Sequence, residues 1–90
     1  MNRLAGKVAL ITGAGQGVAQ GIAFAMAAAG ASVVVAGRTL EKVQRTATEI
    51  ARRGGEALAT ACDVKSASDL SRVVDECVLR FGGIDILVNN

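Results

Sequence analysis

The glycines between the first apolar run and the first helical segment are the residues best placed to do chemistry. The apolar run at residues 8–11 precedes Gly13, Gly15 and Gly17, and the Ala-rich helical segment that follows stops at Gly30. The start of a helix exposes unpaired backbone N–H groups and the positive end of the helix dipole. Glycine also lets a phosphate approach the backbone closely. The segment therefore predicts an anion site, and a nucleotide phosphate is the first ligand to expect there.

A second polar set follows the next apolar run, residues 32–36, and consists of Gly37, Arg38 and Thr39. In a nucleotide site, an acidic residue at this point would bind the ribose hydroxyls and repel a 2′-phosphate. Arg38 can instead hold a phosphate in a bidentate grip, and the Thr39 hydroxyl can add one more hydrogen bond. The alternative interpretation is that Arg38 is only a solvated turn residue.

Composition and charge exclude several other functions. The net charge of +2 is small and its basic residues are dispersed, which argues against nucleic acid as a partner. The chain has no histidine, so Cys62 and Cys77 form no zinc-site pattern, and we expect both to be core residues in a reducing compartment. The first apolar run is too short for a signal peptide or a membrane span. A cytoplasmic protein without a membrane partner is the expectation.

Short apolar runs alternate with helical patterns along the whole chain. An order of β-α-β-α-β-α-β implies a parallel sheet with right-handed crossovers and helices on both faces. At 90 residues the chain makes at most one small domain. The predicted strands cover residues 7–11, 32–36, 57–62 and 84–88, and the predicted helices cover residues 18–29, 40–53 and 67–81.

Capping residues and apolar stripes indicate the ends and buried faces of these helices. Thr39 is the expected N-cap of the second helix, and Ser66 with Asp69 predicts a capping box for the third. Gly30 is the expected C-cap of the first helix. The expected buried stripes are Val18, Ile22, Ala25, Met26 and Ala29 in the first helix, Leu40, Val43, Ala47 and Ile50 in the second, and Leu70, Val73, Val74, Cys77 and Phe81 in the third.

Three motifs together resemble the short-chain dehydrogenase/reductase family. The generic fingerprint G-x-G-x-x-G fails, because Val18 stands where the third glycine would be. Residues 12–19, TGAGQGVA, instead resemble the family's T-G-x-x-x-G-x-G turn. Asp63-Val64 is similar to its acidic-apolar pair beside the adenine, and residues 85–90, DILVNN, are similar to its D-x-L-V-N-N-A-G segment. The resemblance extends over all ninety residues.

The resemblance implies a Rossmann-like, doubly wound parallel sheet with strand order 3-2-1-4, in which residues 1–90 are the N-terminal part of one NAD(P)-binding domain. It places Asp63 against the adenine amino group and the Asn90 backbone beside the ribose, although Asp63 could simply end its strand and turn the chain. Asn89 is expected to bond within the sheet, and Asp85 to be structural. The implied cofactor-binding residues are Gly13, Ala14, Gly15, Gln16, Gly17, Val18, Arg38, Thr39, Asp63, Val64 and Asn90.

Two departures from the family pattern bear on the cofactor. Ala19 replaces the third glycine, and its extra methyl predicts slightly looser packing or a shifted phosphate rather than lost binding. Gln16 stands where the family often has a second basic residue. Arg38 and Thr39 nevertheless favour NADP(H) over NAD(H).

The resemblance also implies chemistry that these ninety residues do not carry. The family interconverts carbonyls and alcohols by hydride transfer with a Ser and a Tyr-x-x-x-Lys, and this chain has no tyrosine, so no catalytic residue is assigned. We interpret the chain as the N-terminal portion, cut after Asn90, of a longer enzyme that acts on a small molecule and forms a homo-oligomer. The alternatives are a stand-alone nucleotide-binding module, and a structural domain with an empty turn or an edge strand that pairs with another chain.

Overall fold

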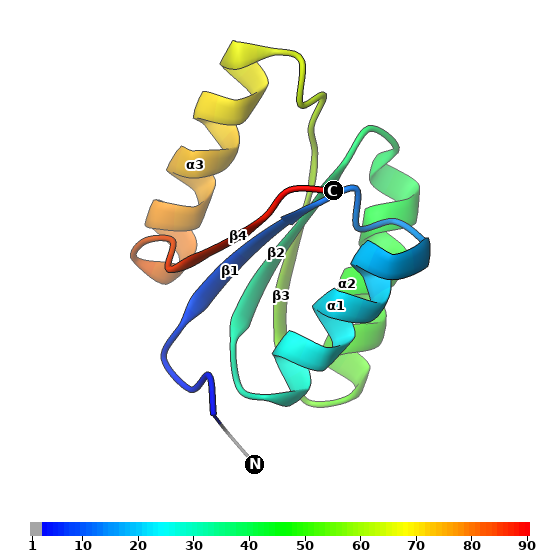
Figure 1. The fold of residues 1–90 in the computed structure, drawn as a ribbon, viewed down its shortest axis with the longest axis vertical. Coiled ribbons are helices and arrows are strands. Elements are labelled where there is room, and N and C mark those ends of the chain that lie inside the picture. Colours follow the sequence, from blue (N-terminus) through cyan, green and yellow to red (C-terminus); the bar gives the residue numbers. More distant parts are fainter. Residues whose placement is uncertain (1–2) are drawn as a thin grey trace.

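Four parallel strands form one sheet that carries helices on both faces (Figure 1). The computed structural model describes residues 3–90. The strand order is β3-β2-β1-β4, and each neighbouring pair is parallel, which confirms the predicted Rossmann-like topology. The elements in chain order are β1 (Val8–Thr12), α1 (Gly17–Ala28), β2 (Ser32–Gly37), α2 (Leu40–Arg52), β3 (Glu56–Ala61), α3 (Ala67–Phe81) and β4 (Ile86–Val88).

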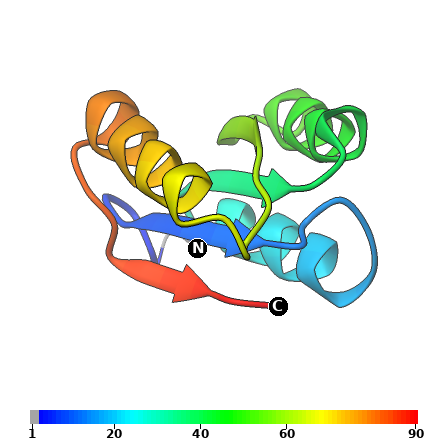
Figure 2. The ribbon, with the colours of Figure 1, turned by 90° about the horizontal axis from the view of Figure 1, so that it is seen from above.

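The sheet separates two layers of core, because successive side chains of a strand point to opposite faces. Ile11 and Val35 face α1 and α2, where they pack with Val43 and Ile50. Val34 faces the other way, into a smaller cluster under α3. Figure 2 shows α3 on one side of the sheet and the other two helices on the opposite side. The β1 and β2 strands are buried on both faces, as their unbroken apolar runs predict.

The buried face of α1 differs from the predicted one. Val18 is 75% exposed, whereas Ala19 and Ala23 are fully buried against the sheet. Ile22 and Met26 of the predicted stripe are partly buried beside this core, and Ala25 is exposed. The predicted stripe was therefore wrong at Val18 and Ala25, and it omitted Ala19 and Ala23, which lie deepest. The helix instead presents its alanines, whose small side chains let its backbone lie close to the strands.

The expected stripes of α2 and α3 are only partly confirmed. Val43, Ala47 and Ile50 are buried as predicted, but Leu40 at the first turn of α2 is exposed. Val73 and Cys77 are buried under α3, whereas Leu70 and Val74 are 37% and 43% exposed. These two residues, with Leu87 of β4, line a hollow of about 330 Å³ beside the β4 edge. They remain exposed because α3 covers β1 and β2 with one side only.

The N-caps of the second and third helices behave differently. Ser66 Oγ accepts a hydrogen bond from Asp69 N at 3.2 Å, as a capping box requires. The carboxylate of Asp69 does not return this bond to Ser66, since it accepts from Asp63 N at 2.9 Å instead. The predicted capping box is therefore correct in one of its two bonds. Thr39 is the N-cap of α2 by position, but its side chain caps no helix N–H group.

Asp85 has the structural role that was expected. Val8 N donates to Asp85 Oδ2 at 2.9 Å, and Asp85 N donates to Val8 O at 2.8 Å. The carboxylate thus takes a strand position beside β1, and β4 begins only at Ile86. This explains why β4 is two residues shorter than predicted.

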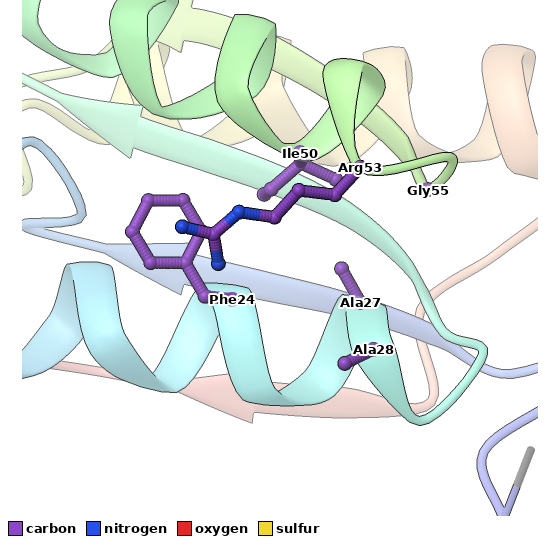
Figure 3. A pocket seen from close by; sticks show the side chains of 6 residues that line it. All are labelled: Phe24, Ala27, Ala28, Ile50, Arg53 and Gly55. Atoms are coloured by element: carbon purple, nitrogen blue, oxygen red, sulfur yellow. The ribbon is translucent and has the colours of Figure 1, made fainter. Parts of the chain in front are cut away.

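A small hollow separates the C-terminal ends of α1 and α2 (Figure 3). Its volume is about 70 Å³. The Arg53 guanidinium lies over the Phe24 ring, 4.5 Å from the ring centre, and its Nε donates to Glu49 Oε2 at 2.8 Å. This arrangement stabilises the packing of the two helices at the amino edge of the sheet, opposite to the edge where the glycine turn lies.

Candidate functional site

The predicted site residues gather at the carboxyl edge of the sheet. Because the strands are parallel, the segments that follow β1, β2, β3 and β4 all begin at this edge. They carry Gly13, Arg38, Asp63 and Asn90 respectively. Ligands of open α/β sheets bind outside the carboxyl ends of the strands, so the topology places these residues at the position where a site is expected.

The turn between β1 and α1 has a backbone that only glycine adopts readily at two positions. Gly13 has φ of 66° and Gly17 has φ of 67°, both in the left-handed region. Gln16 precedes α1 in an extended conformation, and its side chain caps no helix N–H group. The first turn of α1 contains no acidic residue. The backbone N–H groups at the start of α1 and the positive end of its dipole are therefore available to an anion.

Thr46 of α2 holds this turn in place from behind. Its fully buried Oγ1 donates to Ala14 O at 3.0 Å and accepts from Gln20 Nε2 of α1 at 3.1 Å. Ala14 N in turn donates to Ala36 O at the end of β2. One hydroxyl thus links the turn to both helices. The apolar periodicity of α2 gave no sign of Thr46, and only its place between the buried Val43 and Ala47 could have suggested it.

The turn and the end of β2 line one open hollow of about 270 Å³. Thr39 and Arg38, the predicted phosphate-binding pair, share it with Gly13, Gly15 and Gln16 of the turn. The structure therefore brings five of the eleven predicted residues to one surface. The remaining lining residues are Gly37, Lys42 and Val43.

Lys42 is the functional candidate that the sequence analysis missed. It lies in the first turn of α2, and its Nζ donates to Gln16 Oε1 at 3.2 Å. A Cβ built on Gly15 would lie only 2.8 Å from Lys42 Cβ, so the glycine is needed for this close approach. In the sequence Lys42 is one exposed charge among several on α2, and only the packing of α2 on the turn distinguishes it.

Gly37, the last residue of β2, leaves no room for a side chain. A Cβ at this position would lie 2.9 Å from Cγ1 of the buried Val43. An acidic side chain at this position would bind the ribose hydroxyls of NAD(H) and repel the 2′-phosphate of NADP(H). Arg38 is the next residue along the chain.

Asp63, Val64 and Asn90 lie apart from this hollow. Asp63 Oδ1 accepts from Lys65 N at 2.9 Å, which is the turn-forming role given as its alternative. Val64 lines the apolar hollow beside β4 instead. Asn90 N donates to Thr12 Oγ1 at 3.1 Å, and Asn90 Nδ2 would lie 3.1 Å from a Cβ at Gly13. Asn90 therefore borders the glycine turn, and its place beside a ribose stays a prediction.

Ala14, Gly17 and Val18 complete the predicted set around the start of α1. Ala14 is fully buried, so only its backbone can serve a ligand, whereas Gly17 and Val18 are exposed. Ala19, which replaces the family's third glycine, is accommodated without exposure in the core under the helix. Thr12 Oγ1 donates to Asn89 Oδ1 at 3.0 Å, so Asn89 bonds across to β1 as expected.

The cysteines and acidic residues offer no further chemistry at this edge. Cys62 and Cys77 are both free and buried, and burial raises the pKa of each thiol. Over residues 3–90, no three metal-ligating side chains come together. Within the same range, no helix has both the length and the apolar character that a membrane crossing requires.

The fold and the geometry of this edge define a Rossmann-like nucleotide-binding α/β protein. Residues 7–90 match the family described as short chain dehydrogenase, and the chain belongs to this family. Over 88 residues it is 46% identical to 7alpha-hydroxysteroid dehydrogenase of Escherichia coli strain K12, covering 98% of this chain and 34% of that protein. It is 47% identical to the hydroxynaphthalene reductase-like protein Arp2 of Metarhizium guizhouense, covering 97% of this chain and 33% of that protein.

Solved structures agree with this assignment. A crystal structure of hydroxysteroid dehydrogenase from Escherichia coli superposes with a TM-score of 0.96 at 45% identity, over 98% of this chain and 37% of that one. A 7 alpha-hydroxysteroid dehydrogenase complexed with NADH and 7-oxo glycochenodeoxycholic acid gives a TM-score of 0.95 at 45% identity, over 98% of this chain and 34% of that one. The chain spans about a third of the length of the curated relatives it matches.

Proposed function

We propose that this chain is the cofactor-binding portion of a dehydrogenase that prefers NADP(H) to NAD(H) and interconverts a carbonyl and an alcohol by hydride transfer. The observation that carries the cofactor preference is the position of Arg38. It follows β2 directly and lines the same hollow as the glycine turn. A dinucleotide whose pyrophosphate lies at the start of α1 would bring its adenosine end to this hollow.

The residues present fit such a cofactor. Gly13 and Gly17 shape a turn whose N–H groups can receive the pyrophosphate, and Gly15 lets the first turn of α2 pack closely against this turn. Arg38 and Thr39 supply a fork of N–H donors and a hydroxyl for a 2′-phosphate. In the same proposal Asp63 and Val64 receive the adenine, and the backbone of Asn90 lies beside the ribose. The remaining members, Ala14, Gln16 and Val18, line the path of the pyrophosphate and the adenosine.

The choice between the two cofactors depends on local residues. One solved relative is described as a complex with NADH, so a close variant of this fold accepts the cofactor without a 2′-phosphate. In this chain, Gly37 leaves the end of β2 without a carboxylate, and Arg38 adds a cation. Both features favour the phosphorylated cofactor.

The Arg38→Ala substitution tests the cofactor preference. We expect NADPH and 2′-phospho-AMP to bind more weakly by about 1.5–3 kcal/mol, because a hydrogen bond to a charged group is lost. NADH should bind almost as before. Arg80→Ala is the matched control, since Arg80 is an exposed arginine near the far end of α3. Calorimetric titration of each variant with each ligand gives the comparison. Equal losses for NADPH and NADH would show that Arg38 does not recognise the 2′-phosphate.

The reaction itself is a separate part of the proposal, supported by membership of the short-chain dehydrogenase family. Because these ninety residues contain no tyrosine for the catalytic role, the test uses the longer enzyme of which the chain is proposed to be a portion. NADPH absorbance is followed while that enzyme is offered a panel of ketones, beginning with a 7-oxo bile acid. Saturable cofactor binding by that enzyme without turnover of any ketone would count against the proposed reaction and favour a nucleotide-binding protein without catalysis. A homo-oligomeric assembly and a cytoplasmic location belong to the same proposal, and sedimentation and cell fractionation test them.

A further inference from the structure

Two contacts hold the Lys42 side chain at the hollow between the glycine turn and the end of β2. Its Cβ lies against Gly15, at the point where any side chain on that residue would collide. Its Nζ donates to Gln16 Oε1 at 3.2 Å. The aliphatic stem therefore packs on the glycine turn, while the ammonium group lies beside Gln16 on the surface shared with Arg38 and Thr39.

The charges around Lys42 leave its ammonium group available to an anion. Glu41, the adjacent carboxylate, forms an ion pair with Arg45 at 2.7 Å. Among residues 3–90, the ion pairs join Glu41 to Arg45, Glu49 to Arg52 and Arg53, and Glu76 to Arg72; neither Lys42 nor Arg38 takes part in one. Two cations thus line one hollow without a carboxylate partner. Thr39 adds a hydroxyl that caps no helix N–H group.

We propose that Lys42 is the second cation of the 2′-phosphate subsite and that Gln16 is its positioning residue. This inference rests on the proposed NADP(H) function. Gln16 stands where the family often has a basic residue, and the structure shows an ammonium group from α2 bonded to that glutamine. The ammonium group therefore lies at the glycine turn, although Lys42 belongs to α2. Arg38 grips the phosphate with a planar fork, and Lys42 acts as a compact point charge that Gln16 positions.

The Lys42→Met substitution tests this role, because methionine keeps an unbranched stem over Gly15 and removes the charge. We expect the Kd of NADPH and of 2′-phospho-AMP to rise by between about three- and tenfold, as suits a partly exposed charge pair. The Kd of NADH should change by less than about twofold. The salt dependence of NADPH binding should also become weaker. Lys7→Met, which removes an exposed lysine at the amino edge of the sheet, should change none of these values.

A rescue variant distinguishes charge from packing. Adding Gln16→Lys to Lys42→Met returns a cation to the turn itself, and most of the lost NADPH affinity should return. A failure to recover would overturn the proposal, as would an equal loss of NADPH and NADH binding in Lys42→Met. If Lys42→Met changes nothing while Arg38→Ala weakens NADPH alone, the Lys42 inference fails and the proposed function stands. If Arg38→Ala weakens both cofactors equally, the proposed function fails first.

Discussion

Replacing Gly15 by alanine tests whether the close contact between the turn and α2 shapes the site. Gly15 does not have a positive φ, so alanine is acceptable to its backbone and the cost is steric. The new methyl would lie 2.8 Å from Lys42 Cβ, which is fixed to the backbone of the first turn of α2 and cannot swing away. Relief requires α2 to move away from the turn, and this also strains the bond between Thr46 and Ala14. We expect a loss of about 1–3 kcal/mol in the free energy of unfolding, the usual cost of overpacking.

Gly21→Ala is the matched control, with an effect of the opposite sign. Gly21 lies inside α1, and a Cβ there would meet nothing within 4 Å. Alanine should therefore stabilise the protein by about 0.5–1 kcal/mol, because glycine is a poor helix residue. The two variants should differ by about 1.5–4 kcal/mol in total.

Urea denaturation followed by far-ultraviolet circular dichroism measures both effects, since the chain has no tryptophan or tyrosine to report by fluorescence. Gly15→Ala should also weaken NADPH and NADH binding together, because it displaces the turn and not the phosphate-binding cations. A Gly15→Ala protein as stable as Gly21→Ala would refute the argument from the α2 contact.

Three further predictions concern Thr46, Glu49 and the two cysteines. Thr46→Val keeps the volume but leaves Ala14 O without its buried donor, so the free energy of unfolding should fall by about 1–3 kcal/mol in denaturant melts; an unchanged midpoint would contradict this. Arg52 and Arg53 hold the pKa of Glu49 at about 2, below its ordinary value of 4.5. Its folded pKa is depressed, so its contribution to stability is present above about pH 4.5 and lost as the pH falls towards 2. The free energy of unfolding of Glu49→Gln should therefore be lower than that of the parent protein at pH 7. In denaturant melts the two values should converge as the pH falls towards 2. Cys62 and Cys77 are buried with raised pKa values, so a thiol reagent at pH 8 should modify them only after unfolding; rapid labelling of the native protein would be inconsistent with their packing.

Local pattern predicted the elements of this fold well. The apolar runs and glycine stops placed all seven elements within one or two residues, and α3 coincides with its predicted range. The strand order followed from the resemblance and is confirmed. Asp85 shows where local pattern failed, because its carboxylate bonds to the distant Val8 and delays the start of β4.

Helix faces were harder to predict. In α1 the alanines Ala19 and Ala23 meet the sheet while Val18 faces solvent. A count of hydrophobic residues favours the larger side chains, but the distance between a helix and the sheet beneath it selects small ones. That distance depends on how the layers pack together, so the sequence of one helix does not specify it.

The glycine turn, its place between a buried strand and a helix, and the arginine after the second strand could be read from the amino-acid order, because each depends on neighbours along the chain. The support of the turn by Thr46 and the bond from Lys42 to Gln16 became visible only in the folded chain. Those contacts join residues about thirty positions apart. They exist because α2 packs its first turn against Gly15, and no local pattern in either segment specifies that approach.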